Sequence, residues 1–175
     1  MVSHNYNVQL RSADPDELSA IWEIISYAIE KRRQEGSSQW QDGYPNPTVI
    51  QNDIDQHWAF VLLVEGEIVA YAALIKNFEP AYDEIVGQWL SHQEYYVVHR
   101  LAVSPHFVGQ GWGKRMMKEI ESWVVQQKIY SIKLDTNFDN LSMLAILKDL
   151  QYQYCGKVYF RGSERLAFEK LLLSS

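Results

Sequence analysis

The sequence predicts a mixed α/β fold, in which a central and mostly antiparallel sheet of about seven strands is flanked by helices. Two observations predict it. Strand-like and helical segments alternate along all 175 residues. The first half contains a hairpin, and the second half repeats the strand, helix, strand order of βαβ crossings. A single domain over residues 1–175 is expected, because a chain of this length can bury about 70% of its unfolded surface.

The first helix is predicted by its start signal and its apolar period. A short strand over Asn7–Arg11 comes before it. Asp14 can cap the helix, Pro15 suits its first position, and Glu17 can reach back to close a capping box. Apolar residues then recur at helical spacing until Gly36, so one face of this helix should be buried.

A second short helix and a hairpin are expected next. The helix covers Thr48–Gln56. Trp58–Val64 and Glu67–Ile75 are apolar and rich in β-branched residues, and Glu65-Gly66 between them indicates a tight turn. The stretch Asn77–Gln93 is irregular and acidic, so we interpret it as an excursion between strands.

The second half of the chain alternates strands with helices. The expected elements are a strand over Tyr95–Val103, a helix from a glycine-rich loop to about Lys128, a strand over Ser131–Thr136, a helix capped by Asn140, and strands over Tyr152–Phe160 and Arg165–Leu173. Tyrosine and valine in the first of these strands indicate a central, buried position. The apolar final strands make a homodimer plausible, because an exposed strand edge can pair with a second copy.

Composition excludes several classes of partner. Sixteen basic and 22 acidic residues give a formal charge of −6, which argues against nucleic acid. The apolar runs are shorter than the roughly 20 residues that span a bilayer, and the first ten residues lack the features of a signal peptide. Cys155 is the only cysteine, which excludes an internal disulfide and a cysteine metal site. A cytoplasmic protein without a metal or a membrane partner is expected.

The stretch Leu101–Met117 carries the strongest functional signal. It runs from an apolar strand through three closely spaced glycines, Gly109, Gly111 and Gly113, into a helix-forming segment. Glycines allow the backbone to turn sharply and approach a ligand, and a helix start offers amide groups to an anion such as phosphate. The spacing fits neither the Walker A loop nor the dinucleotide fingerprint.

This stretch resembles the acyl-CoA-binding signature of the GCN5-related N-acetyltransferase (GNAT) superfamily, R/Q-x-x-G-x-G/A after a strand that ends in an L-x-V-x-P pattern. Leu101–Pro105 matches the strand end, and Gly111 and Gly113 match the two fixed glycines. Val108 stands where the family prefers Arg or Gln, a departure that should weaken binding modestly. The order of elements, including Asn140 at the start of the later helix, is similar over nearly the whole chain.

The resemblance implies acetyl-CoA as a co-substrate that is held mainly by backbone amides, with Lys114 and Arg115 adding charge near the phosphates. It implies transfer of the acetyl group to a primary amine by direct attack in a ternary complex. The implied cofactor contacts are Leu101, Ala102, Val103, Val108, Gly109, Gln110, Gly111, Trp112, Gly113, Lys114, Arg115 and Asn140.

Three groups are expected to carry the chemistry. His99 is the candidate base that deprotonates the amine, since it lies two residues before Leu101 and should share its strand face. The resemblance implies that the Leu101 amide faces the thioester carbonyl. The family's usual acid is a tyrosine, but Leu147 occupies that position, so Tyr152 is the candidate substitute and unassisted departure of the thiolate is the alternative.

The acceptor, a small-molecule or peptide amine, is expected to bind beside Trp40, Asp42 and Tyr44 and the stretch around residues 82–84. Aromatic rings and a carboxylate suit a cationic amine. The alternative to acceptor binding is that the aromatic residues of this loop only pack the loop itself. A second functional hypothesis is a non-catalytic acyl-CoA sensor or interaction module with the same fold, which Leu147 and Val108 would explain.

Overall fold

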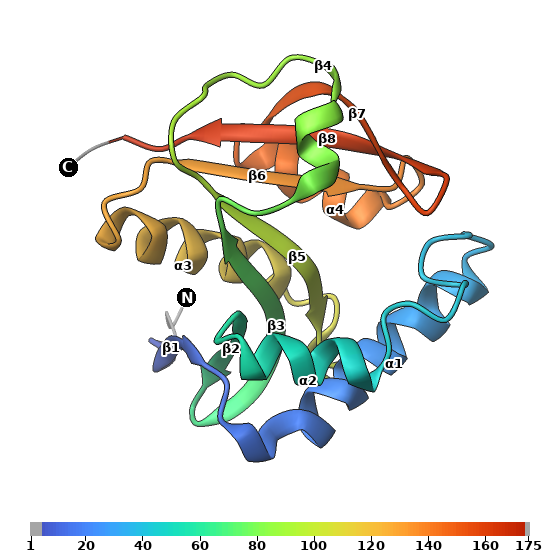
Figure 1. Cartoon of the computed structure of the whole chain (residues 1–175). Coiled ribbons are helices and arrows are strands. Elements are labelled where there is room, and N and C mark those ends of the chain that lie inside the picture. The colour runs from blue at the N-terminus through green and yellow to red at the C-terminus, as the bar shows by residue number, and fades with distance from the viewer. Residues whose placement is uncertain (1–4, 174–175) are drawn as a thin grey trace. The chain divides into compact units, whose positions relative to one another are not determined.

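A computed structural model describes residues 5–173. The helices and strands are, in chain order, β1 Val8–Ser12, η1 Pro15–Glu17, α1 Leu18–Gln34, α2 Pro47–Asp55, β2 Ala59–Val64, β3 Glu67–Lys76, η2 Pro80–Glu84, β4 Val86–Gly87, β5 Tyr96–Val103, η3 Pro105–Phe107, α3 Trp112–Gln126, β6 Ser131–Thr136, α4 Leu141–Asp149, β7 Gln153–Phe160 and β8 Ser163–Leu171, where η marks a 3-10 helix (Figure 1). The predicted elements are therefore all present.

The strands form one sheet in the order β1-β2-β3-β5-β6-β8-β7-β4. The β5–β6 pair is parallel, whereas β1–β2, β2–β3, β6–β8, β7–β8 and β4–β7 are antiparallel. This confirms the predicted mixed α/β class. The described strands number eight rather than about seven, because the excursion before β5 contains the two-residue strand β4. A strand this short leaves no periodicity in the sequence.

The chain divides into two compact units, which we describe separately. The first contains the described residues up to Ala73 together with Arg100–Met116, and the second contains Leu74–His99 and the residues from Met117 onward. Strands β3 and β5 contribute residues to both units. The single domain predicted from the sequence stays a prediction.

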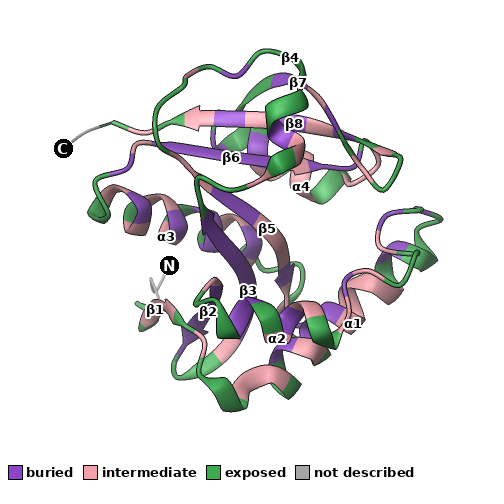
Figure 2. Cartoon of the chain, in the orientation of Figure 1, coloured by how far each residue is buried: buried purple, intermediate pink, exposed green. Residues whose placement is uncertain are grey.

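The first unit has one apolar core between α1, α2 and the strands (Figures 1 and 2). Its fully buried members come from all of these elements: Ile21, Ile25, Ile50, Val61 and Tyr71. The predicted capping box is present, with Glu17 Oε2 accepting a hydrogen bond from the Asp14 amide at 2.8 Å, but it caps η1, and α1 begins only afterwards, at Leu18. Glu65 and Gly66 both have positive φ, at 51° and 84°, which confirms the tight turn between β2 and β3.

In the second unit, β8 lies between β6 and β7, with hydrogen-bonded partners on both sides (Figure 1). Trp123 of α3 packs edge-on against Tyr96 of β5, with ring centroids 5.1 Å apart. Since β8 is not at an edge of the sheet, its backbone offers no free edge for pairing with a second copy. The homodimer stays a prediction, without that physical reason.

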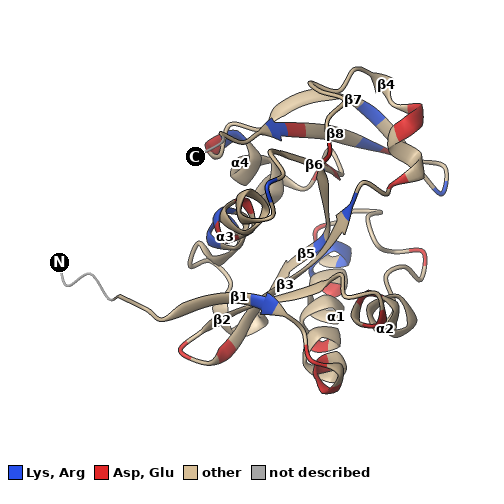
Figure 3. Cartoon of the chain, turned by 60° about the vertical axis from the view of Figure 1, so that its left-hand side comes forward, with Lys and Arg blue, Asp and Glu red and all other residues tan. Residues whose placement is uncertain are grey.

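Charged residues lie within strands β6 and β8 (Figure 3). Lys133 and Glu169 are both buried, with 4% and 0% of their surface exposed.

Among the described helices, none combines the length and the hydrophobicity that crossing a bilayer requires.

Candidate active site

The glycine-rich loop connects η3 to α3. Gly109 and Gly111 have φ of 74° and 82°, and a Cβ added to either would meet no atom within 4 Å. The backbone angle, and not crowding, therefore requires glycine at these two positions. Gly113 lies inside α3, which begins at Trp112. The loop thus leads directly into a helix start, where the first amides have no carbonyl partner within the helix. This arrangement fits an anionic phosphate.

Val108 precedes this loop with 36% of its surface exposed. An apolar side chain there supplies no hydrogen bond and no charge to an anion. The hydrogen bonds and the positive charge for an anion would have to come from the backbone of the loop and from the nearby cations Lys114 and Arg115. The modest weakening expected from Val108 stays a prediction.

Strand β5 is bulged at Arg100, whose φ is 56°. Arg100 points toward α2, and Ala102, two residues on, belongs to the core of the first unit. Side chains alternate only along extended backbone. Because Arg100, between His99 and Leu101, is in the left-handed region, simple alternation does not place these two side chains on one face, and their common face stays a prediction. His99 remains a candidate base on other grounds.

The Arg100 side chain is held by a buried polar network in the first unit. Its Nε and Nη2 donate to the two carboxylate oxygens of Asp53 at 2.9 and 2.6 Å, and its Nη1 donates to the Tyr44 hydroxyl at 2.5 Å. The Tyr71 hydroxyl donates to the same carboxylate of Asp53. Burial and the charge of Asp53 raise the pKa of the Tyr71 hydroxyl well above its usual value. The network fixes the bulge that immediately precedes the Leu101 amide.

His99 lies in the second unit within reach of a carboxylate. Its Nε2 is 2.8 Å from Glu79 Oε2, and both side chains are mostly buried, with 14% and 16% exposed. Its ring contacts Tyr82 and Phe160, with centroids 6.3 and 6.2 Å apart. A histidine that is paired with a carboxylate in an aromatic setting is the usual arrangement of a general base with an orienting partner.

A second carboxylate, Asp135 of β6, belongs to the same group. It accepts a hydrogen bond from the Tyr82 hydroxyl at 2.6 Å. Burial raises the pKa of Asp135, although the nearby His99 acts in the opposite direction. Two carboxylates, a histidine and a tyrosine therefore converge here, a composition typical of proton-transfer sites.

The residues predicted to bind the acceptor do not converge on one point. The Tyr44 hydroxyl contacts Arg100. Trp40 lines a pocket of about 370 Å³, together with Trp22 and Pro45. Asp42 is exposed. The loop is thus partly packed by its own aromatic residues, as the alternative interpretation expected, and the acceptor role of these three residues stays a prediction.

Tyr152 and Asn140 lie in the second unit. The Tyr152 hydroxyl is buried without a hydrogen-bond partner among residues 5–173. Burial and the charge of Glu121 raise the pKa of this hydroxyl well above its usual value. Asn140 caps α4 as predicted, its Oδ1 accepting from the Met143 amide at 3.2 Å. The acid role of Tyr152 and the cofactor role of Asn140 stay predictions.

No sequence pattern predicted the contacts of five charged residues: Glu79, Asp53, Arg100, Asp135 and Lys133. The available signal was a charge inside an apolar strand, as at Arg100, Lys133 and Asp135. Such residues need a buried partner. Glu79 gave no signal, because it lies in the irregular excursion and only the fold brings it to His99.

Comparison with known proteins decides the family. The model of the acetyltransferase (GNAT) family matches residues 21–151, which is most of the chain. The chain belongs to the GNAT family. This confirms the resemblance seen in the sequence, and the GNAT assignment agrees with the loop geometry and the order of the elements described above.

Three proteins that are similar to this chain show how far the similarity extends. A GNAT acetyltransferase structure from Streptococcus agalactiae 2603 is 37% identical, with a TM-score of 0.87 over 95% of this chain and 96% of that one. The Uncharacterized N-acetyltransferase YesJ of Bacillus subtilis (strain 168) is 26% identical over 81% of this chain and 79% of its own. The yncA structure from Salmonella typhimurium, which contains its cofactor acetyl-CoA, shares the fold at 13% identity, with a TM-score of 0.67 over 96% of this chain and 95% of that one.

Proposed function

We propose that this GNAT protein is an N-acetyltransferase that transfers the acetyl group of acetyl-CoA to a primary amine by direct attack in a ternary complex. The observation that carries the proposal is the loop at Gly109 and Gly111, whose positive φ angles lead the backbone into the start of α3. A pyrophosphate is the part of acetyl-CoA that such a loop would bind.

The remaining cofactor contacts are proposed from the family pattern. The backbone of Leu101–Val103 would pair with the pantetheine arm, and Asn140 would add a further contact. The family resemblance is what supports both contacts.

The chemistry needs a neutral amine and a donor for the oxyanion. We propose that His99 accepts the proton of the ammonium, while Glu79 orients the ring and stabilises its charged form. The amine then attacks the thioester carbonyl, whose oxygen would accept a hydrogen bond from the Leu101 amide. The C–S bond breaks, the nitrogen that attacked loses its second proton to water, and the thiolate leaves as it takes a proton, from Tyr152 or from water. The thiol pKa of about 8.5 allows departure without an acid.

The first experiment combines binding and turnover. A ligand at about 100 times its Kd stabilises a protein by about 2.7 kcal/mol, so acetyl-CoA should raise the Tm by several degrees. If millimolar acetyl-CoA leaves the Tm unchanged, the proposed function is wrong. Release of free CoA thiol should then be measured with a panel of amines. A raised Tm without thiol release from any amine would favour the acyl-CoA sensor.

A second experiment tests the proposed residues. His99→Ala should lower kcat by about 100-fold, the range that a general base contributes, with little change in the Kd of acetyl-CoA. His57→Asn is the matched control, because His57 is exposed and Asn tolerates its φ of 60°. Tyr152→Phe should lower kcat if Tyr152 is the acid. An unchanged kcat in either variant removes that residue from its role.

A further inference from the structure

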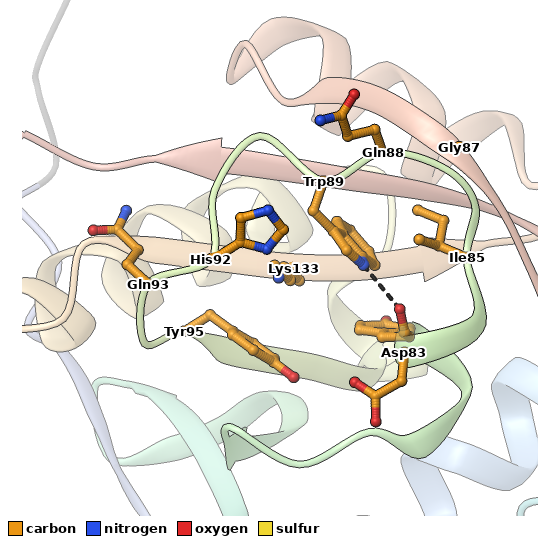
Figure 4. Close-up of a pocket in the computed structure, with 10 residues that line it drawn as sticks. Asp83, Ile85, Gly87, Gln88, Trp89, His92, Gln93, Tyr95 and Lys133 are labelled. Carbon is orange, nitrogen blue, oxygen red and sulfur yellow. Dashed lines mark hydrogen bonds between the residues drawn. The ribbon is translucent and has the colours of Figure 1, made fainter.

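A pocket of about 350 Å³ lies in the second unit, between the excursion before β5 and strand β6 (Figure 4). Trp89 and Tyr95 form its aromatic walls, and Lys133 of β6 lies beneath them. Asp83 and His92 also line it. The volume is that of a site for a small molecule. Neither the loop at Gly111 nor the proposed chemistry uses this pocket.

Lys133 is the unusual residue of the pocket. Only 4% of its surface is exposed, and its Nζ lies 4.6 Å from the centroid of the Trp89 ring and 4.1 Å from that of Tyr95. Within residues 5–173, no hydrogen bond from this ammonium is formed. An ammonium group has three donors, and solvent reaches this Nζ, since it is not among the fully buried atoms that lack a partner in residues 5–173. The two rings attract the cation by about 0.5–2 kcal/mol but do not accept its hydrogen bonds in the usual sense.

The buried carboxylate paired with Lys133 across β6 and β8, that of Glu169, already has its own partners. Glu169 of β8 accepts hydrogen bonds from the Leu90 amide at 2.6 Å, the Ser91 hydroxyl at 2.6 Å and the Ser131 hydroxyl at 2.7 Å. These bonds attach the 88–91 segment, which carries Trp89, to the sheet. Glu169 therefore holds the segment that forms one wall of the pocket. The N–H donors of Lys133 face the pocket.

The pocket lies close to the group around His99. Lys133 is paired with Val97 of β5, and His99 lies two residues farther along that strand, a rise of about 7 Å. Tyr82 lines the pocket and also contacts the His99 ring. A molecule with one end on Lys133 could therefore present its other end to His99 and Glu79 if the two ends are separated by a short carbon chain.

We propose that this pocket binds the carboxylate of the acceptor, with the Lys133 ammonium as its partner, so that the acceptor is an amino acid whose reacting amine is separated from the carboxylate by several carbon atoms. The assignment of this ligand as the acceptor rests on the proposed N-acetyltransferase function. Carboxylate binding by Lys133 does not. The apolar stem of such a molecule would pack on the rings of Trp89 and Tyr95.

The test uses three matched amines, 6-aminohexanoate, its carboxamide and hexylamine. In thiol-release kinetics with acetyl-CoA, 6-aminohexanoate should have a KM at least about tenfold below those of the other two. Lys133→Met should raise that KM about tenfold or more, change kcat little, and leave the KM of hexylamine unchanged. Lys133→Gln should act in the same direction and serves as the second variant if Lys133→Met does not fold. Lys157→Met is the control, because Lys157 is a half-buried lysine of β7 that pairs with Glu164 and does not line the pocket, and this variant should change neither constant.

Binding is measured separately by titrating 6-aminohexanoate into the protein without acetyl-CoA. A heat of binding that disappears in Lys133→Met would support carboxylate binding in the pocket. If that heat is seen but no amine is acetylated, only the proposed function is overturned. Turnover of all three amines with equal KM, unaffected by Lys133→Met, would overturn the carboxylate proposal and leave the acetyltransferase intact. Absence of both binding and turnover would overturn both proposals.

Discussion

His99 Nε2 and Glu79 Oε2 lie 2.8 Å apart, although the two residues are 20 positions apart in the chain. Glu79 is held there because it is also the N-cap of η2, where its carboxylate accepts a hydrogen bond from the Ala81 amide at 3.3 Å. The pair is mostly buried. A carboxylate in this position fixes the orientation of the imidazole ring.

Glu79→Gln should lower kcat about 10- to 100-fold, with little change in the Kd of acetyl-CoA. The amide can still hydrogen-bond to the ring but cannot stabilise its positive charge. Steady-state kinetics over a range of pH would measure this. Glu84→Gln, an exposed residue of the same short helix, is the matched control and should behave as the unchanged protein. Equal kcat values for the two variants at every pH would contradict the role of Glu79.

Val108→Arg should tighten acetyl-CoA binding about fivefold. The exposed side chain precedes the loop, and a guanidinium there can add a charge-assisted hydrogen bond to the pyrophosphate, worth about 1 kcal/mol at an exposed site. Titration calorimetry at low and high salt would measure it. The gain should shrink at high salt, because screening weakens exposed ion pairs. A Kd that does not change at low salt would show that Val108 lies away from the phosphates.

Gly111→Ala and Gly113→Ala should differ in their effects. Gly111 has φ of 82°, which costs an L-residue about 1–2 kcal/mol, so Gly111→Ala should lower the Tm and weaken acetyl-CoA binding. Gly113 lies within α3, where alanine is the better helix former by about 1 kcal/mol. Gly113→Ala should therefore keep or raise the Tm. Thermal unfolding with and without acetyl-CoA tests both, and equal losses would refute the assigned backbone roles.

Asp53→Asn should destabilise the protein by about 3–5 kcal/mol, because it leaves the Arg100 guanidinium buried without its counter-charge. The double variant Asp53→Asn/Arg100→Met should lose less free energy of unfolding than Asp53→Asn alone. Chemical denaturation gives the free energies of unfolding. Glu30→Gln is the control, since the ion pair of Glu30 with Arg33 is exposed and its loss should have no measurable effect. Additive losses in the double variant would show that the two side chains act independently.

Lys133→Met should raise the Tm at pH 7. Burial lowers the pKa of Lys133, although Glu169 and Asp83 act in the opposite direction. The unfolded chain therefore keeps this proton to a higher pH than the folded protein does, up to about pH 10.4. Stability rises with pH between the two pKa values, so the cost of the buried charge is fully present below the folded pKa and disappears above the unfolded one.

The Tm difference between Lys133→Met and the unchanged protein should accordingly be largest near neutral pH and vanish above about pH 10.5. Thermal unfolding at a series of pH values measures it. If Lys133→Met is more stable but no longer binds a carboxylate, the charge of Lys133 lowers stability and serves binding, which is a common trade-off between stability and function. A lower Tm for the variant at pH 7 would show that the cation–π contacts outweigh the cost of burial.

Strand pairing shows where sequence patterns were sufficient. Ser131–Thr136 was predicted as a strand with the bounds that the structure has, because its apolar period and its flanking residues are local signals. The two-residue strand β4 was missed, since its only cause is pairing with β7 at Lys157 and Gly156. The bulge at Arg100 was missed for a similar reason. Its left-handed φ is maintained by Asp53 and Tyr44, which come from distant segments.

The sequence by itself determined the fold class, the family and the loop that suits a phosphate, because glycine angles, helix caps and apolar periods act within a few residues. Only the tertiary structure decided which charged side chains meet. The pairing of Glu79 with His99, the hold of Asp53 on Arg100 and the position of Lys133 beneath Trp89 and Tyr95 all join segments that are distant in the chain. Burial makes those contacts strong, and burial is a property of the folded chain.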